Sequence, residues 1–367
     1  MARPAVQNRP VGADVPAPPP PSRFRRARGA LQLLFGLAVA GIVLWVVGGQ
    51  RGELQGALSY LENLKWQWVV MAGVMEFLCI VAFGAMQRVL MEAGGVRAHL
   101  ADMTAIAFAG NAIQNSLPAG PLWSNVFAFR QFKRRGADDV LAVWVLVATS
   151  IASAASLALV AVLGLIFAHN QDVAADLAAV AGGIVGLLLI VRYLLRRHTW
   201  TLAIAAGAVR LSQRLLRHPR GDAKELVDQG WARLTAVAPG RHVWVLAFAF
   251  AAANWLWDCL ALALCFLAVG QGVPWQGLLL AYSAAQLAIN IPITPGGLGV
   301  VEGSLTIALV AYGGQKEATV AAVVLYRLIS FWGLLGVGWA AWAVLAYQTR
   351  RHERAEERAD EREGVVA

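Results

Sequence analysis

The sequence predicts an all-α integral membrane protein, built as a polytopic helical bundle, and composition and hydropathy are the reasons. Of its 367 residues, 58% are hydrophobic and only 14% are charged. Soluble domains carry about a quarter charged residues, so this chain cannot cover itself with a polar surface. Its long apolar stretches are rich in Leu, Ala and Val and do not alternate with polar residues, which favours spanning helices over barrel strands.

The N-terminal part is expected to be a basic cytosolic tail followed by a first spanning helix. Residues 1–29 combine a proline run with arginines up to Arg28, which is typical of a disordered tail ending at a membrane surface. The apolar run 30–48 is near spanning length, and no convincing cleavage site follows it. We therefore predict an uncleaved signal-anchor helix.

Five later segments reach roughly the twenty residues that a helix needs to cross the hydrocarbon. They are residues 66–87, 140–168, 174–195, 242–269 and 318–347.

Two further apolar segments, 101–132 and 275–313, are broken near the middle by Pro and Gly, and each half is short for a full crossing. We predict a re-entrant helical hairpin for each. Ordinary spans kinked by proline are the alternative.

Basic residues define the predicted topology. With a cytosolic N-terminus and six crossings, 27 of the 31 Lys and Arg residues fall on the cytosolic side. Arg51, Lys65 and Lys316 fall outside, and Arg327 lies within a span. This bias predicts a multi-pass protein of the bacterial inner (plasma) membrane with both termini cytoplasmic. It also explains the net charge of +9 without a nucleic-acid partner.

The same topology divides the chain into a membrane domain and cytosolic parts. The membrane domain is 30–347, and it includes a basic amphipathic segment, 196–241, that we expect to lie on anionic lipid. The charged tail 348–367 is expected to be a solvated extension of the last helix.

An inverted repeat is predicted within the membrane domain. Each half runs span, broken hairpin, span, and the basic residues give the two halves opposite orientations. Paired broken helices in opposed repeats mark the binding site in many transporters. The second arm of each hairpin would start near the bilayer centre, beside Pro121 and Gly299. Because a helix N-terminus carries free N–H groups and partial positive charge, two such ends would attract an anionic headgroup.

At these breaks the sequence resembles a known family. The run from Pro295 to Ser304, the run from Leu325 to Trp332, the stretch from Asn111 to Pro121, and Asp258 are similar to the transmembrane region of lysylphosphatidylglycerol synthases. The resemblance covers about 60–347. Stand-alone relatives are called flippase-like membrane proteins.

The resemblance implies lipid translocation or lipid handling. Larger members of this family add a cytosolic domain that transfers an aminoacyl group from tRNA to phosphatidylglycerol. Only residues 348–367 follow the last predicted span of this sequence, which is too few for such a domain, so we expect no aminoacyl transfer. The resemblance does not identify the substrate of this chain, because stand-alone relatives need not share the substrate of the larger members.

The candidate substrate-binding residues are polar, charged or backbone-opening positions inside the apolar segments. An intramembrane charge costs roughly 2.5–3.5 kcal/mol on insertion scales and needs a partner. We expect Arg327 to rest on Glu302 and to release it for a lipid phosphate, although Glu302 could instead serve its own helix dipole alone. Asp258, Asn111, Asn115 and Asn290 could have a structural role instead of contacting the substrate. For Glu76 we expect a structural role. The candidates are Asn111, Asn115, Pro118, Gly120, Asp258, Asn290, Pro295, Gly296, Gly297, Gly299, Glu302 and Arg327.

The sequence shows no enzyme constellation and no cofactor or metal motif. Its six histidines are scattered, its three cysteines lie in apolar runs, and it has no phosphate-binding Gly-rich loop with lysine. The expected partners are membrane lipids with anionic or aminoacylated headgroups, or a lipid-linked sugar.

Two alternatives stay open. One is a non-transporting lipid-binding or scaffold subunit for a lipid-modifying enzyme, and the other is a small-solute transporter. A homo-oligomer is compatible with each.

Overall fold

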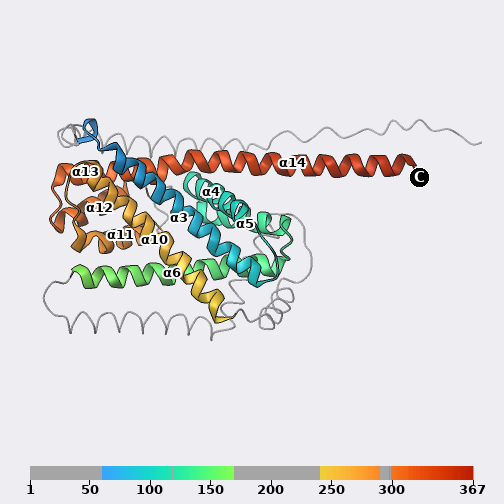
Figure 1. Ribbon diagram of the computed structural model, residues 1–367, viewed down its shortest axis with the longest axis horizontal. Coiled ribbons are helices and arrows are strands. Elements are labelled where there is room, and N and C mark those ends of the chain that lie inside the picture. Colours follow the sequence, from blue (N-terminus) through green and yellow to red (C-terminus); the bar gives the residue numbers. More distant parts are fainter. Residues whose placement is uncertain (1–59, 118, 169–239, 290–296, 298, 367) are drawn as a thin grey trace, which may run out of the picture. The chain divides into compact units, whose positions relative to one another are not determined.

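The computed structural model describes residues 60–117, 119–168, 240–289, 297 and 299–366, and the described part of the chain is helical apart from short connections (Figure 1). The described residues belong to one compact unit of the chain. The predicted tail 1–29, the spans 30–48 and 174–195, and all of the segment 196–241 except its last two residues lie outside the described residues.

Four described helices are long and apolar enough to cross a membrane, as the sequence predicts. They are α3 (Trp66–Ala93), α6 (Asp139–Ala168), α10 (Arg241–Ala268) and a continuous stretch, Lys316–Arg351. A helix of 28 residues rises about 42 Å at 1.5 Å per residue, which exceeds the roughly 30 Å of hydrocarbon.

Helix α3 continues beyond the predicted end of its span. The prediction stops before Arg88, the first charge after the apolar run, but the helix ends only at Ala93. Arg88 donates to Glu92 one turn later, over 2.8 Å from Nε to Oε1. Such an i,i+4 pair stabilises an exposed helix end, so the helix outlasts its apolar part.

The last spanning stretch contains an interruption that the sequence does not predict. It consists of α13 (Lys316–Arg327), a π-helix η2 (Leu328–Gly333) and α14 (Leu334–Val366). Single π-helical turns inside α-helices are frequent at functional sites. This one begins directly after Arg327. Helix α14 runs through the charged tail to Val366, so the predicted helical extension is confirmed.

Both predicted breaks occur. The first segment forms α4 (Leu100–Ser116) and α5 (Gly120–Arg134), and the second forms α11 (Trp275–Ile289) and α12 (Val300–Ala311). Within each segment the two arms pack against each other. This favours two separate arms over one kinked span, while entry and exit at the same membrane face stay a prediction.

The first break is a tight turn that depends on glycine. Helix α4 ends at an extended Leu117, and Ala119 then adopts a left-handed conformation, with φ of 54°. Gly120, the first residue of α5, lies so close to the backbone of Gln114 that a Cβ atom would overlap its carbonyl oxygen. Only a residue without a side chain permits this return of the chain.

Helices of each half of the chain pack against helices of the other half. Helix α4 of the first broken segment packs against α14, and α11 of the second packs against α6, while α3 packs against α10. Two glycines permit the closest crossings. A Cβ at Gly164 on α6 would lie 2.6 Å from the backbone nitrogen of Leu280, and one at Gly338 on α14 would overlap the carbonyl oxygen of Phe108. Membrane helices associate through such small residues.

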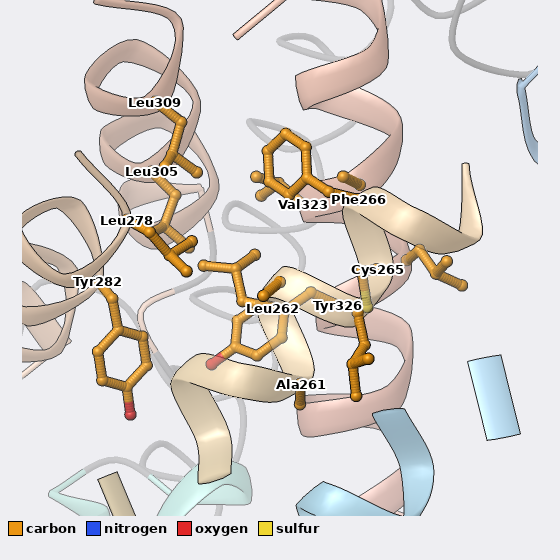
Figure 2. Close-up of a cluster of buried hydrophobic side chains, with 14 of the residues drawn as sticks. Ala261, Leu262, Cys265, Phe266, Leu278, Tyr282, Leu305, Leu309, Val323 and Tyr326 are labelled. Atoms are coloured by element: carbon orange, nitrogen blue, oxygen red, sulfur yellow. The ribbon is translucent and has the colours of Figure 1, made fainter. Parts of the chain in front are cut away.

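Two large apolar cores, each with members from both halves, hold the helices together. The core with most of its members in the second half is shown in Figure 2, where Leu262 and Phe266 of α10 lie among side chains of α11, α12 and α13. Tyr282 and Tyr326 belong to this core although each carries a hydroxyl group. A buried hydroxyl needs a hydrogen-bond partner, so these two phenols indicate a polar group at the edge of the core.

Candidate functional site

A polar cavity of about 810 Å³ lies between the broken segments and the long helices. Its lining comes from α3, α4, α5, α6, α10, α11, α13, η2 and the start of α14. The polar lining residues are Glu76, Gln87, Asn111, Gln114, Asn115, Ser124, Asn125, Thr149, Ser150, Ser153, Asn254, Asp258, Gln286, Tyr326, Arg327 and Ser330. This number of polar groups in an apolar helical bundle is costly unless they meet partners, water or a ligand.

Asp258 on α10 is the acceptor of three hydrogen bonds. Tyr282 of α11 donates to its Oδ2 over 2.7 Å, and Tyr326 of α13 donates to its Oδ1 over 2.7 Å. Gln286, one turn after Tyr282, donates to Oδ2 over 3.0 Å. Hydrogen bonds to a carboxylate are about twice as strong as neutral ones. Asp258 therefore joins α10, α11 and α13 at the cavity wall.

Glu76 on α3 is a second carboxyl group at the same wall. Its side chain is 2% exposed, and Asp258 is its acidic neighbour. The Oε1 atom of Glu76 has no hydrogen-bond partner within the described part of the chain. Glu76 lines the cavity beside Asp258, and the structural role expected for it stays a prediction.

Arg327 and Glu302 form the ion pair that the sequence predicts. The Nε atom of Arg327 donates to Oε1 of Glu302 over 2.7 Å, and the two side chains are 10% and 27% exposed. The other carboxylate oxygen accepts from the backbone N–H of Gly299 over 2.6 Å, at the start of α12. The guanidinium carbon lies 4.7 Å from the centroid of the Phe331 ring in η2. Glu302 thus serves its helix end and Arg327 together.

Two asparagines of α4 bond to each other at the first break. Asn115 donates to Oδ1 of Asn111 over 3.0 Å, and both line the cavity. This contact joins two side chains, and the role of both asparagines at the break stays a prediction. Pro121, the second residue of α5, lies at the same wall.

The predicted site residues divide into three groups. Four of them line the cavity: Asn111, Asn115, Asp258 and Arg327. Gly120, Gly297, Gly299 and Glu302 are described but are not among its lining residues, and Glu302 is linked to it through Arg327. Pro118, Asn290, Pro295 and Gly296 lie outside the described residues.

Several lining residues give no signal in the sequence. Gln87, Thr149 and Ser330 line the cavity, and a side-chain oxygen of each is buried without a hydrogen-bond partner in the described structure. Single Ser, Thr or Gln residues are common in membrane helices, where they often bond within the bundle. Only the arrangement of the helices identifies these three as part of one wall. Among the described residues, no group of His, Cys, Asp and Glu could hold a metal ion.

Comparison with known protein families gives one match along most of the chain. Residues 33–338 match the family model described as the lysylphosphatidylglycerol synthase TM region. The matched residues include both broken segments and every described residue of the cavity wall.

Curated relatives agree with this match. A UPF0104 membrane protein of Methanothermobacter thermautotrophicus is 24% identical over 334 residues, which cover 86% of this chain and 94% of the relative. A second similarity to a UPF0104 membrane protein of that organism is 35% identical over 91 residues, covering 25% of this chain and 26% of the relative. The long alignment shows that the relative has nearly the same extent as this chain.

Proposed function

Because the chain belongs to the family of lysylphosphatidylglycerol synthase transmembrane regions, we propose that it is a flippase-like membrane protein, which binds a lipid headgroup in the polar cavity and passes it between leaflets. The acyl chains would stay in the bilayer while the headgroup crosses beside α10 and α13. The proposal takes the lipid to be an anionic or aminoacylated phospholipid, or a lipid-linked sugar.

The cavity is the observation that carries this proposal. A headgroup cannot cross hydrocarbon without losing its hydration, which costs several kcal/mol for each unsatisfied polar group. A wall of amides, hydroxyls and charged groups offers replacement hydrogen bonds inside the bundle. The volume of about 810 Å³ is within the range of small-molecule sites.

Arg327 is the residue we assign to a headgroup phosphate. An arginine can hold a phosphate by two parallel hydrogen bonds. In the described state its Nε atom donates to Glu302. A phosphate would compete with Glu302 for the guanidinium group, and Glu302 would keep its bond to the N–H of Gly299. The ion pair then acts as a switch between empty and loaded states.

The test is lipid exchange in vesicles that contain the purified full chain. Fluorescently labelled phosphatidylglycerol, phosphatidylethanolamine and glucosyl diacylglycerol are placed in both leaflets, and a membrane-impermeant quencher reports how fast inner-leaflet lipid reaches the outer leaflet. We expect faster exchange of at least one lipid than in protein-free vesicles. Arg327→Ala should slow it by roughly tenfold or more, the loss expected for a charged hydrogen bond.

Arg88→Ala is the matched control, because it removes an arginine whose ion pair with Glu92 is exposed. It should exchange lipid at the wild-type rate. A folded protein that binds lipid without accelerating exchange would favour the alternative, a lipid-binding or scaffold subunit for an enzyme supplied in trans. If Arg327→Ala exchanged lipid at the wild-type rate, the proposed switch role of the Arg327–Glu302 ion pair would be wrong.

A further inference from the structure

The wall of the cavity formed by α4, α5 and α6 is neutral and dense in hydrogen-bonding groups. Among its described lining residues are four carboxamides and four hydroxyls, and none carries a formal charge. They are Asn111, Gln114, Asn115, Ser124, Asn125, Thr149, Ser150 and Ser153. Gln114, Asn125 and Ser150 line the cavity and are exposed, so their side chains are not packed away.

This chemistry suits a polyhydroxylated ligand. Each carboxamide offers one acceptor oxygen and two N–H donors, and each hydroxyl both donates and accepts. A sugar presents neighbouring hydroxyls that likewise donate and accept. Thr149 adds a hydroxyl oxygen that is buried without a partner in the described structure, in a residue that is 5% exposed and lines the cavity.

The charged residues of the lining limit how much negative charge the ligand can carry. Arg327 is the one Lys or Arg among the described lining residues, and its Nε atom already donates to Glu302. Asp258 and Glu76 add two carboxyl groups to the lining. One phosphate can face Arg327, but a second anionic group would meet carboxylates rather than cations.

An aromatic ring completes the wall. Trp255 of α10 lines the cavity, and its Nε1 donates to the carbonyl of Ser153 on α6 over 2.9 Å. That bond ties the indole of α10 to α6, the helix that carries Thr149, Ser150 and Ser153. An aromatic face is apolar and can cover the C–H face of a sugar ring.

We infer that the headgroup recognised in this cavity is a sugar, held by the carboxamides and hydroxyls of α4, α5 and α6. The inference rests on the proposed function, because it names the substrate class of the same cavity. The sugar could be joined to diacylglycerol or, through a phosphate, to a polyprenyl chain. In both cases the sugar contacts the neutral wall, and only the second source brings a phosphate to Arg327.

Lipid binding by the purified full chain tests the inference without requiring transport. Native mass spectrometry compares glucosyl diacylglycerol, a polyprenyl phosphate glucose, phosphatidylglycerol and phosphatidylethanolamine, with acyl chains matched among the glycerolipids. We expect at least one sugar lipid to bind roughly tenfold or more tightly than the two phospholipids, as several hydrogen bonds would give. Loss of the polyprenyl lipid alone in Arg327→Ala would identify the phosphate-linked source.

Gln114→Leu and Asn125→Leu are the informative variants. Both side chains are exposed, so their replacement leaves helix packing intact. Each should weaken sugar-lipid binding by roughly two- to tenfold and change phospholipid binding by less than twofold. Gln67→Leu is the control, since Gln67 is an exposed amide on α3 that does not line the cavity.

The outcomes separate this inference from the proposed function. Equal binding of sugar lipids and phospholipids, or equal weakening of all lipids by the two variants, overturns the inference even if exchange in vesicles is observed. A sugar preference that both variants abolish supports it. If that preference occurs without lipid exchange, the inference of sugar recognition is supported and the proposed translocation is wrong.

Discussion

Asp258 is a carboxylate held inside a membrane bundle by donors from two other helices. Tyr282 and Tyr326 are 0% and 3% exposed, and both hydroxyls donate to it. A charged group in an apolar bundle depends on such hydrogen bonds, because a charge without partners is costly there. The network thus fixes how α10, α11 and α13 face one another beside the cavity.

Tyr326→Phe and Tyr282→Phe should each destabilise the protein. Each variant keeps the ring and removes one hydrogen bond to a carboxylate, a loss of about 1.5–3 kcal/mol. We expect a lower midpoint of thermal unfolding in detergent, followed by tryptophan fluorescence. Tyr347→Phe, at an exposed position, should unfold at the wild-type temperature. Wild-type midpoints for both core variants would show that Asp258 draws its stability from elsewhere.

The broken segments and the π-helix add polar groups to those that the long helices bring to the cavity. Arg327 is the last residue of α13, and Ser330 and Phe331 of η2 also line the cavity. A π-helical turn holds one more residue than an α-helical turn, so it changes which side chains face a given direction. The interruption therefore sets the direction of Arg327 independently of the face that α14 packs against α4.

The crossing of α14 over α4 should tolerate no side chain at Gly338. A Cβ there would overlap the carbonyl oxygen of Phe108, whereas Gly336 in the same helix has open space around its Cα. Gly338→Ala should cost about 1–3 kcal/mol, the range for overpacked sites, because backbone cannot move aside as a flexible side chain does.

Gly336→Ala is the matched control, and it should leave stability unchanged or raise it slightly through better helix propensity. The measurement is again the unfolding midpoint, together with the fraction of monodisperse protein after detergent extraction. Equal behaviour of the two alanine variants would contradict a close crossing at Gly338.

At the scale of the whole molecule, the exchange of contacts between halves supports the predicted inverted repeat. Helix α4 packs on α14 and α11 packs on α6, which is the pairing that a two-fold relation between the halves would produce. In transporters built this way, the site lies where the broken elements of the two halves approach. The described cavity is lined from both halves.

Cysteine labelling should reveal the predicted orientation. Cys79, Cys259 and Cys265 are free and buried, so an introduced exposed cysteine is the reactive one. Gly272→Cys, in the α10–α11 connection, should react with a membrane-impermeant maleimide in intact cells. Arg97→Cys, in the α3–α4 connection, should react only after permeabilisation, because the basic loops are predicted to be cytosolic. The reverse pattern would invert the topology.

The sequence predicts the positions of the described helices well because hydropathy is a local property. The ends of α6 and α10 agree with their predicted spans to within a residue, and each broken segment is divided into two helices, between Ser116 and Gly120 and between Ile289 and Val300. The sequence also predicts the Arg327–Glu302 pair, since an intramembrane charge requires a partner of opposite sign. The sequence does not predict the π-helix, because nothing in its composition distinguishes it from an apolar α-helix.

What the sequence determined by itself is the membrane class, the spans and the breaks, since the length of each apolar run decides whether a helix can cross the hydrocarbon. What only the tertiary structure decided is which polar groups meet: Asp258 with two tyrosines, Glu76 beside it, and the carboxamides of α4 and α5 at the same cavity as Trp255. The reason is physical. Lipid exerts no hydrophobic force that selects a helix face, so small residues and interhelical hydrogen bonds set the rotation and crossing of each helix.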